Sequence, residues 1–356
     1  MQVQHPYLGE HADILFFSRG KGRGHAVPDA AIAAELVERQ PSLSITFVSY
    51  GLGSDTLRNF GWKVIDLELS EEHALWDSVA RTLRVLERLR PRLVVSHEEF
   101  WVIPLAKALG VRSVFLTDWF IGAETLQMQA LTYADAILFA DERGYHDEPR
   151  YLKGKITYVG TIFRCFHLDQ ADRDRRRREL DIQPHSRVVL VVPGGAEFHS
   201  EARAPLFDLV LNAFDSLPIA EKCLLWITGE PDYGALVQKT RGLSNIRVLE
   251  PHDGFTSTLL AADVVVTKGN RTPILECEAI GVPTVTISFG FNPIDDFRVA
   301  RVSTNVSLRA RGIDSEVLME HLMTGMSRPR LARNSDTARS RMTVAGHIER
   351  MLQFAP

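Results

Sequence analysis

The residues best placed to do chemistry follow an apolar run in the second half of the chain, Val264–Val266. The polar residues Thr267–Asn270 come next, and a helix is expected to begin at once, with Glu276 one turn inside it. A strand, a polar turn and a helix start form the arrangement in which backbone N–H groups and the helix dipole hold a phosphate. A carboxylate one turn further on can reach a ribose. The pattern predicts a nucleotide or sugar nucleotide at this end of the strand.

A second candidate is the glycine-rich segment Ser18–His25, which follows the apolar strand expected at Ala12–Ser18. Alternate glycines let a backbone turn tightly and approach a ligand. The segment has neither the GxGxxG dinucleotide pattern nor the Gly-Lys-Ser/Thr of a P-loop. What remains is a turn that presents His25 at a helix N-terminus, where an imidazole can act as a general base. The alternative is a histidine bonded to nearby backbone.

Asp118 and the pair Gly194-Gly195 each follow an expected strand. The Asp118 carboxylate could orient the ring of His25, as a third group orients a catalytic base, or it could cap the next helix. The glycine pair could let the backbone approach a phosphate or a sugar, although a plain turn explains it nearly as well.

Further acidic and basic residues have simpler explanations. Asp295 and Asp296 could bind sugar hydroxyls, and helix capping is the alternative. The triplet Asp172-Arg173-Asp174 resembles a metal-binding DxD but lies in a basic helix, so no metal site is predicted. The run Arg173–Arg178 is expected to be a solvated helix face, with contact to an acidic surface as the weaker alternative.

Strands and helices alternate along the whole chain, which predicts parallel α/β sheets covered on both faces. Strands are expected at 12–18, 44–50, 63–67, 92–96, 113–117 and 136–140, and then at 187–192, 223–228, 246–249, 264–267 and 284–287. This pattern divides the chain into an N-terminal domain, 1–162, a second domain, 163–335, and a C-terminal helix, 336–356. Doubly wound domains bind ligands at the carboxyl ends of their strands, so a cleft between the two is expected.

The 356 residues suffice for two domains. A net charge of -4 argues against a general nucleic-acid binder. The three cysteines, Cys165, Cys223 and Cys277, have no metal-ligand spacing and indicate reduced thiols. Neither a membrane span nor a signal-peptide pattern is present, so we expect a cytoplasmic protein with membrane contact only at its surface.

Together these segments resemble the GT-B glycosyltransferases, most closely the peptidoglycan N-acetylglucosaminyltransferase and diacylglycerol glycosyltransferase branch, family 28. The resemblance covers nearly the whole chain in order. It rests on GKGRGH, FLTDWF, ADAILFADE with ITYVGTIFR, and VVTKGNRTPILECEAIGVP, the last being the most specific.

The resemblance implies an inverting transfer from a nucleotide-activated sugar, favouring UDP, to an acceptor hydroxyl, with no cofactor and no obligatory metal. His25 or Asp118 would deprotonate the acceptor, and Glu276 would bind the ribose. The remaining donor-side residues would be Gly194, Gly195, Lys268, Gly269, Asn270, Arg271, Thr272, Asp295 and Asp296.

The chain departs from that branch at two places in the donor loop and in the charge of its first loop. Asn270 stands where glycine is usual and Pro273 where a small residue is usual. The acceptor-side loop would comprise Arg19, Gly22, Arg23 and Gly24, and its basic residues fit an anionic acceptor unless they are simply solvated.

Two other functions fit the same residues. A nucleotide-sugar hydrolase would use His25 to activate water, and a non-catalytic protein would only bind the sugar nucleotide. A 2-epimerase is less favoured, because the acidic and basic groups that it needs cannot be placed. Neither the acceptor nor the oligomeric state follows from the sequence.

Overall fold

A computed structural model describes most of the chain and divides it into two compact units. The described residues are 12–70, 74–118, 125–144, 148–162, 168–193, 200–229, 232–251, 254–269, 271–288, 302–330 and 338–353. The first unit comprises residues 1–165 and 337–356, and the second comprises 166–336. The chain thus returns to its first unit at the C-terminus.

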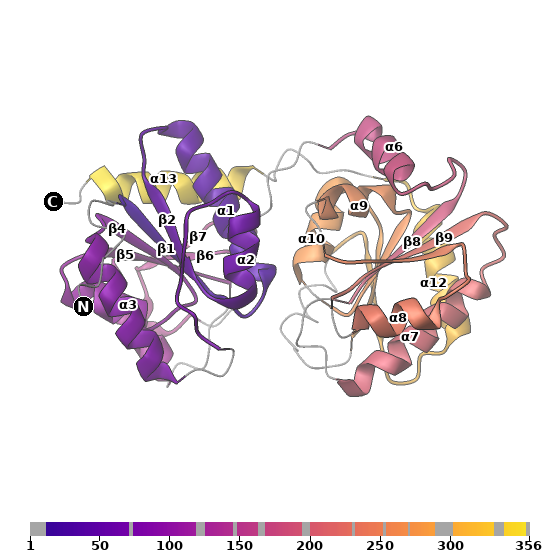
Figure 1. Cartoon of the computed structure of the whole chain (residues 1–356), viewed down its shortest axis with the longest axis horizontal. Coiled ribbons are helices and arrows are strands. Elements are labelled where there is room, and N and C mark those ends of the chain that lie inside the picture. Colours follow the sequence, from indigo (N-terminus) through magenta and orange to yellow (C-terminus); the bar gives the residue numbers. More distant parts are fainter. Residues whose placement is uncertain are drawn as a thin grey trace, which may run out of the picture. The chain divides into compact units, whose positions relative to one another are not determined.

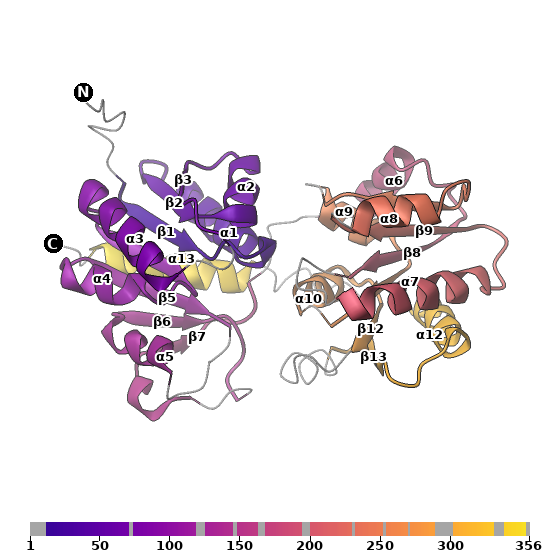
Figure 2. The ribbon, with the colours of Figure 1, turned by 60° about the horizontal axis from the view of Figure 1, so that its bottom comes forward.

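The first unit contains a seven-stranded parallel sheet in the order β3-β2-β1-β4-β5-β6-β7 (Figures 1 and 2). Its strands are β1 (Ile14–Ser18), β2 (Ile45–Ser49), β3 (Val64–Asp66), β4 (Leu93–His97), β5 (Arg112–Thr117), β6 (Ala136–Phe139) and β7 (Ile156–Tyr158). The strand order reverses between β1 and β4, which lie side by side. In a doubly wound sheet this switch point is where crossovers leave to opposite faces and open a crevice at the carboxyl ends.

Helices cover both faces of this sheet. They are α1 (Arg23–Arg39), α2 (Gly51–Asn59), α3 (Leu75–Leu89), α4 (Val102–Ala108), α5 (Leu126–Ala130) and α13 (Arg339–Gln353), with 3-10 turns at Leu131–Tyr133 and Arg150–Leu152. Alternate residues of β1 supply the two cores, because successive side chains of a strand point to opposite faces. Ile14 and Phe16 pack with residues of α1 and α13, whereas Leu15 and Phe17 pack with residues of α3 and α4.

The second unit repeats the same topology with a six-stranded parallel sheet in the order β10-β9-β8-β11-β12-β13. Its strands are β8 (Arg187–Val192), β9 (Lys222–Ile227), β10 (Ile246–Leu249), β11 (Val264–Thr267), β12 (Thr284–Ser288) and β13 (Asn305–Arg309). Its helices are α6 (Gln170–Glu179), α7 (Ser200–Asp215), α8 (Asp232–Lys239), α9 (Phe255–Ala261), α10 (Arg271–Ile280) and α12 (Ser315–Ser327). The strand order reverses here between β8 and β11.

The predicted fold class of two doubly wound parallel sheets is confirmed. β13 and α12 were not foreseen. That the two units face a cleft stays a prediction. In the described residues, no helix is both long and apolar enough to cross a membrane.

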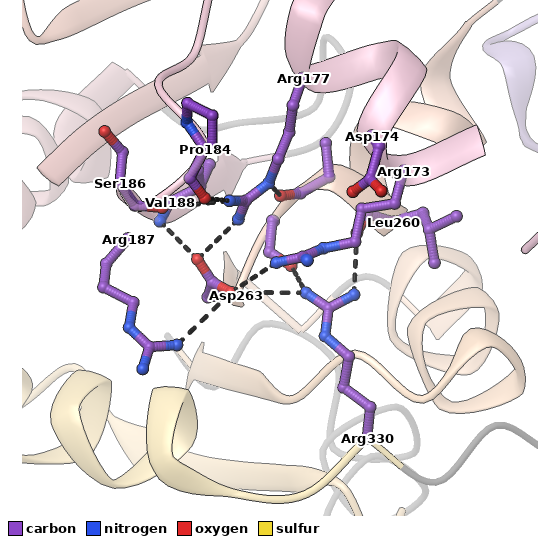
Figure 3. A network of polar contacts seen from close by, with 12 residues as sticks. Arg173, Asp174, Arg177, Pro184, Ser186, Arg187, Val188, Leu260, Asp263 and Arg330 are labelled. Carbon is purple, nitrogen blue, oxygen red and sulfur yellow. Dashed lines mark hydrogen bonds and ion pairs between the residues drawn. The ribbon is translucent and has the colours of Figure 1, made fainter. Parts of the chain in front are cut away.

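The basic helix α6 differs from its prediction as a solvated face, because two of its arginines bind a buried aspartate (Figure 3). Asp263, which directly precedes β11, accepts hydrogen bonds from Arg173 Nη2 at 2.9 Å and from Arg177 Nη2 at 2.8 Å. The backbone N–H of Val188 donates to the same carboxylate at 2.8 Å. Arg173 and Arg177 are one helical turn apart and therefore share the inner face of α6. The counter-charge lies 86 positions from Arg177, and the prediction missed it for that reason.

Two more arginines lie close to the same carboxylate. Arg330 Nη2 is 3.6 Å from Asp263 Oδ1, and Arg187 Nη1 is 3.9 Å from it. Arg330 Nη1 also donates to the carbonyl of Leu260 at 2.9 Å. Burial and the neighbouring Arg173 lower the pKa of Arg330 to about 10. The cluster ties α6, β8, β11 and the chain after α12 together, and it explains why this helix is so basic.

In the first unit, α13 is held against α1 by a partly buried ion pair as well as by apolar packing. Glu35 on α1 accepts from Arg39 Nε at 2.8 Å and from Arg341 Nε of α13 at 3.0 Å. Arg39 also reaches Glu349 of α13 at 3.4 Å. Burial alone would raise the pKa of Glu35, but the hydrogen bonds and charges of Arg39 and Arg341 outweigh it, so the pKa lies below its ordinary value of 4.5.

This pair predicts an acid-sensitive contribution to stability. A carboxyl group whose folded pKa is lowered contributes stability above its unfolded pKa and loses it as the pH falls through the folded pKa. We expect Glu35→Gln to lower the free energy of unfolding by about 1–3 kcal/mol at pH 7 and by less at pH 3, because the contribution is lost as the pH falls from 4.5 through the lowered folded pKa. Urea unfolding at both pH values measures this difference. Glu38→Gln, at an exposed position of the same helix, is the control, and an equal loss at both pH values would contradict the assignment.

Candidate functional site

The candidate site lies at the switch point of the first sheet, where the carboxyl ends of β1 and β4 are neighbours. Ser18 and His97, the last residues of the two strands, are paired in register. The chain leaves β1 through residues 19–22 and enters α1 at Arg23, so His25 falls in the first turn of that helix. The register of β1 on β4 therefore brings the glycine-rich loop next to the residues that follow β4.

The carboxylate of Glu98 is the centre of this cluster. Its Oε2 lies 2.9 Å from His25 Nε2 and accepts a hydrogen bond from Arg19 Nη1 at 3.2 Å. Its Oε1 accepts from Thr117 Oγ1, at the end of β5, at 2.9 Å. The Glu98 side chain is only 2% exposed. A buried carboxylate needs such partners, because desolvation of an unpaired charge is costly.

The backbone of Glu98 is unusual, with φ at 60° in the left-handed region. For a residue other than glycine this conformation costs about 1 kcal/mol or more, and it occurs most often at functional sites. The hydrogen bonds of the side chain hold the strained residue, which aims its carboxylate at α1.

A second imidazole–carboxylate pair lies beneath the first. His97 Nδ1 is 2.7 Å from Asp29 Oδ1, and both side chains are buried. Asp29 is one turn after His25 on α1, so the two residues share a face of the helix. The rings of His25 and His97 meet edge to face with centroids 4.6 Å apart. Burial lowers the pKa of His97, but the charges of Asp29, Glu98 and Asp118 outweigh it and the pKa is raised.

A further carboxyl group, Glu99, extends the buried cluster. Burial raises the pKa of Glu99 to about 8, although the hydrogen bond from Tyr50 and the charge of Arg19 act in the opposite direction. Burial, and then the charge of Glu99, also raise the pKa of Tyr50. The charge of Arg19 therefore acts on Glu99 and Tyr50 as well as on Glu98.

The glycines of the first loop have different roles. A Cβ on Gly20 would stand 2.1 Å from the carbonyl oxygen of Tyr50, so this glycine permits two backbone segments to touch. Cβ atoms on Gly22 and Gly24 would meet nothing within 4 Å. Gly22 is the extended residue before α1, and Gly24 is exposed in its first turn. The close approach thus occurs within the protein at Gly20, while the space beside Gly22 and Gly24 is open.

The structure brings some of the predicted acceptor-side residues together. Arg19 and His25 meet at Glu98, whereas Arg23 is exposed. Asp118 directly follows β5 and acts on His97 through its charge. The carboxylate that contacts His25 is Glu98, which the sequence prediction missed together with Asp29 and His97. The available signal was the run His97-Glu98-Glu99, which follows the apolar strand Leu93–Ser96.

Most of the predicted donor-side residues, Lys268–Thr272 and Glu276, follow β11 at the switch point of the second sheet. The strand, turn and helix expected there are present, with Thr267 paired to Val192 of β8 and α10 beginning at Arg271. Gly269 has φ at 99°, which favours glycine, and its N–H donates to Thr267 Oγ1 at 3.2 Å. Lys268 precedes this glycine. Gly194, Gly195, Asn270, Asp295, Asp296 and the side chain of Arg271 lie outside the described residues.

Glu276 lies one turn into α10, as expected, and its side chain is fully buried. Burial and the charge of Glu276 raise the pKa of the adjacent Cys277 thiol. Thr272, at the start of the helix, is half-buried. Contact between Glu276 and a ribose would therefore require its carboxylate to become accessible, and this role stays a prediction.

The two loop glycines give a matched test of the site's architecture. We expect Gly20→Ala to lower the free energy of unfolding by about 1–3 kcal/mol or more, because the new methyl group would overlap a backbone carbonyl that cannot rotate away. Gly22→Ala, where the extended backbone suits any residue, is expected to be nearly neutral. Urea unfolding of both variants measures the difference. Equal stabilities would show that the close contact between Gly20 and Tyr50 is not required.

Comparison with known proteins of similar sequence and structure identifies the fold. No family model matches the chain. A protein of Acetivibrio thermocellus is 23% identical over 293 residues, covering 77% of each chain; it is named UDP-N-acetylglucosamine–N-acetylmuramyl-(pentapeptide) pyrophosphoryl-undecaprenol N-acetylglucosamine transferase. MurG of Acinetobacter baumannii aligns with a TM-score of 0.60 at 13% identity, over 96% of this chain and 99% of that chain. UDP-GlcNAc 2-epimerase of Neisseria meningitidis, bound to UDP-GlcNAc, aligns with a TM-score of 0.69 at 13% identity, over 94% and 100%. The chain therefore has the GT-B fold, and over most of its length it is a distant relative of the N-acetylglucosamine transferases of the MurG type.

Proposed function

We propose that this protein is an inverting glycosyltransferase that moves a sugar from a UDP-sugar to an acceptor hydroxyl. The observation that carries the proposal is the position of His25. It is partly exposed at the switch point of the first sheet, and its Nε2 lies 2.9 Å from the buried carboxylate of Glu98. An imidazole oriented by a carboxylate is the arrangement that general-base catalysis needs.

In the proposed reaction, His25 removes the proton of the acceptor hydroxyl while the oxygen attacks the anomeric carbon. A proton on His25 Nε2 donates to Glu98, which leaves Nδ1 with the lone pair that accepts the acceptor's proton. The Glu98 carboxylate stabilises the imidazolium that forms. The bond from the anomeric carbon to the diphosphate breaks on the opposite side, which inverts the configuration. Asp118 is the alternative base.

The donor side of the proposal rests on the turn after β11. Backbone N–H groups at the start of α10, together with Lys268, Arg271 and Thr272, would offset the charge that develops on the leaving diphosphate. Glu276 would hold the ribose. Gly194 and Gly195 would approach the diphosphate and Asn270 would border it, while Asp295 and Asp296 would bind the sugar. The choice of UDP rests on the similar transferases, whose name gives UDP-N-acetylglucosamine as the donor.

For the acceptor, we propose an anionic molecule such as a lipid diphosphate. Arg19, Lys21 and Arg23 alternate with glycines before α1, and guanidinium groups bind phosphate oxygens in pairs. The relatives' name includes a pyrophosphoryl-undecaprenol acceptor, and a lipid acceptor would bring the protein to a membrane surface.

The function is tested by incubating the purified chain with UDP-N-acetylglucosamine, with and without a pool of lipid diphosphate acceptors. Transfer predicts UDP release that depends on the acceptor, together with a glycosylated product of inverted anomeric configuration by NMR. Stoichiometric release of UDP and free sugar without an acceptor would indicate a hydrolase. Donor binding with no turnover under any condition would indicate a non-catalytic protein.

We predict that His25→Ala lowers kcat about 100-fold or more while UDP affinity changes less than twofold, because a general base contributes about 10²–10⁴ to the rate. Glu98→Gln keeps the shape of the side chain but removes its charge and no longer fixes the tautomer of His25, and we expect a loss of kcat of about 10²–10⁴-fold. Steady-state kinetics and calorimetry with UDP measure the two effects. His347→Ala, at a half-buried position on α13, is the control. Full activity in the His25 variant would transfer the role of the base to Asp118.

We predict that Glu276→Ala weakens donor binding more than about tenfold, because the ribose hydroxyls would lose a charged acceptor. Calorimetry with UDP measures the affinity, and circular dichroism checks the fold of the variant. Glu278→Ala, two residues later on another face of α10, should leave the affinity unchanged. If both variants bind UDP like the unchanged chain, Glu276 is a core residue.

A further inference from the structure

Three side chains of types that can ligate a metal ion converge at the carboxyl end of β4 in the first unit. One nitrogen of His25, one nitrogen of His97 and one carboxylate oxygen of Glu98 all lie within 4.8 Å of one another. Ligand atoms about 2.0–2.1 Å from a tetrahedral zinc ion are separated by about 3.3 Å. The pair His25 Nε2 and Glu98 Oε2, at 2.9 Å, is already near this separation. The remaining separations need to shorten by at most about 1.5 Å.

Two of these three ligands are oriented by further residues, as ligands in metal sites are. Asp29 binds Nδ1 of His97 at 2.7 Å, which fixes the ring and leaves Nε2 as the nitrogen that can ligate. Thr117 donates to Oε1 of Glu98, which fixes the carboxylate with Oε2 toward His25. A carboxylate behind a ligating imidazole is a recurrent feature of metal sites and raises the affinity for the ion.

The charges around the cluster also favour a cation. Asp29, Glu98 and Asp118 are carboxylates that act together on His97. Among the described residues, the cation in contact with the cluster is Arg19, whose Nη1 lies 3.2 Å from Glu98 Oε2. The Arg19 side chain is 27% exposed, and rotation toward solvent would give Glu98 Oε2 to a metal ion.

We propose that His25, His97 and Glu98 form a binding site for one divalent transition-metal ion, of which Zn²⁺ is the best fit. Two imidazoles and one carboxylate suit zinc, cobalt and iron, whereas Mg²⁺ and Ca²⁺ prefer sites made of oxygen atoms. The open coordination positions would hold water or a ligand.

The ion acts as an inhibitor of transfer, a consequence that rests on the proposed function. A metal on His25 Nε2 requires the proton of that imidazole to stay on Nδ1, so the ring no longer accepts the proton of the acceptor. Binding of the ion depends only on the geometry of the three ligands.

The test is a titration of the chelator-treated full chain with Zn²⁺ by calorimetry and with Co²⁺ by visible absorption. We expect one Zn²⁺ per chain with a Kd of about 10 µM or tighter. Bound Co²⁺ should show the intense visible absorption bands of a tetrahedral site, and Mg²⁺ should not bind. His25→Gln, His97→Gln and Asp29→Asn should each weaken Zn²⁺ binding by about 10–100-fold. Arg19→Gln should strengthen it several-fold, because it removes the competing cation. His347→Gln is the control for adventitious binding to a histidine.

Circular dichroism and thermal unfolding check each variant, and if the buried His97 variant does not fold, His25→Gln and Arg19→Gln decide. Zn²⁺ binding that is weaker than about 1 mM, or equal in the unchanged chain and these two variants, would overturn the metal site. A chain that transfers sugar but does not bind Zn²⁺ overturns only this site. A chain that binds Zn²⁺ but never transfers sugar overturns only the proposed function.

Discussion

The candidate site of the first unit depends on one constraint, which is that the buried carboxylate of Glu98 must be paired. A carboxylate with 2% of its side chain exposed must be paired or hydrogen-bonded, and its partners come from three separate segments. Arg19 comes from the loop after β1, His25 from the start of α1, and Thr117 from the end of β5. These segments converge because β1, β4 and β5 are adjacent and parallel, so their carboxyl ends lie at one edge. The topology therefore brings the three segments close to Glu98, and the hydrogen bonds to its carboxylate fix the orientation of their side chains.

The second unit contains a buried carboxylate at the opposite end of its sheet, and the contrast separates structural from functional charge. Asp263 precedes β11, at the amino end, where four arginines and the Val188 N–H surround it. Arg177, which donates to Asp263 at 2.8 Å, also donates to the carbonyls of Ala261 and Ser186 and so ties these segments together. At Glu98 one partner is a partly exposed imidazole, a group that can exchange a proton with a ligand. Of the two carboxylates, Glu98 is therefore the one placed for proton transfer, whereas Asp263 has a structural role.

The fold could be predicted from the sequence because each unit is encoded by local patterns. Apolar β-branched runs such as Val264–Val266 give buried parallel strands, and the helices between them give the crossovers. The site could be predicted only in part, for a physical reason. His25 follows a glycine-rich turn that is visible in the sequence, but Glu98 lies 73 positions away and becomes its neighbour only through the register of β1 on β4. Arg177 was misjudged for the same reason, since its partner Asp263 is non-local.

Arg19 links the two chemistries available at Glu98. While its guanidinium shares Oε2 with His25, the carboxylate is balanced by one permanent cation, and the imidazole keeps a nitrogen that can accept a proton. A metal ion at the same oxygen must displace that guanidinium, because two cations cannot share one buried oxygen without strong repulsion. Under the two proposals, the same residues would serve as a base or as a metal site, but not as both at once. An anionic acceptor that drew Arg19 away from Glu98 would remove the guanidinium that competes with the metal ion. The same acceptor would supply the hydroxyl that His25 deprotonates. Selectivity between proton transfer and metal capture would then depend on how far the acceptor moves a single side chain.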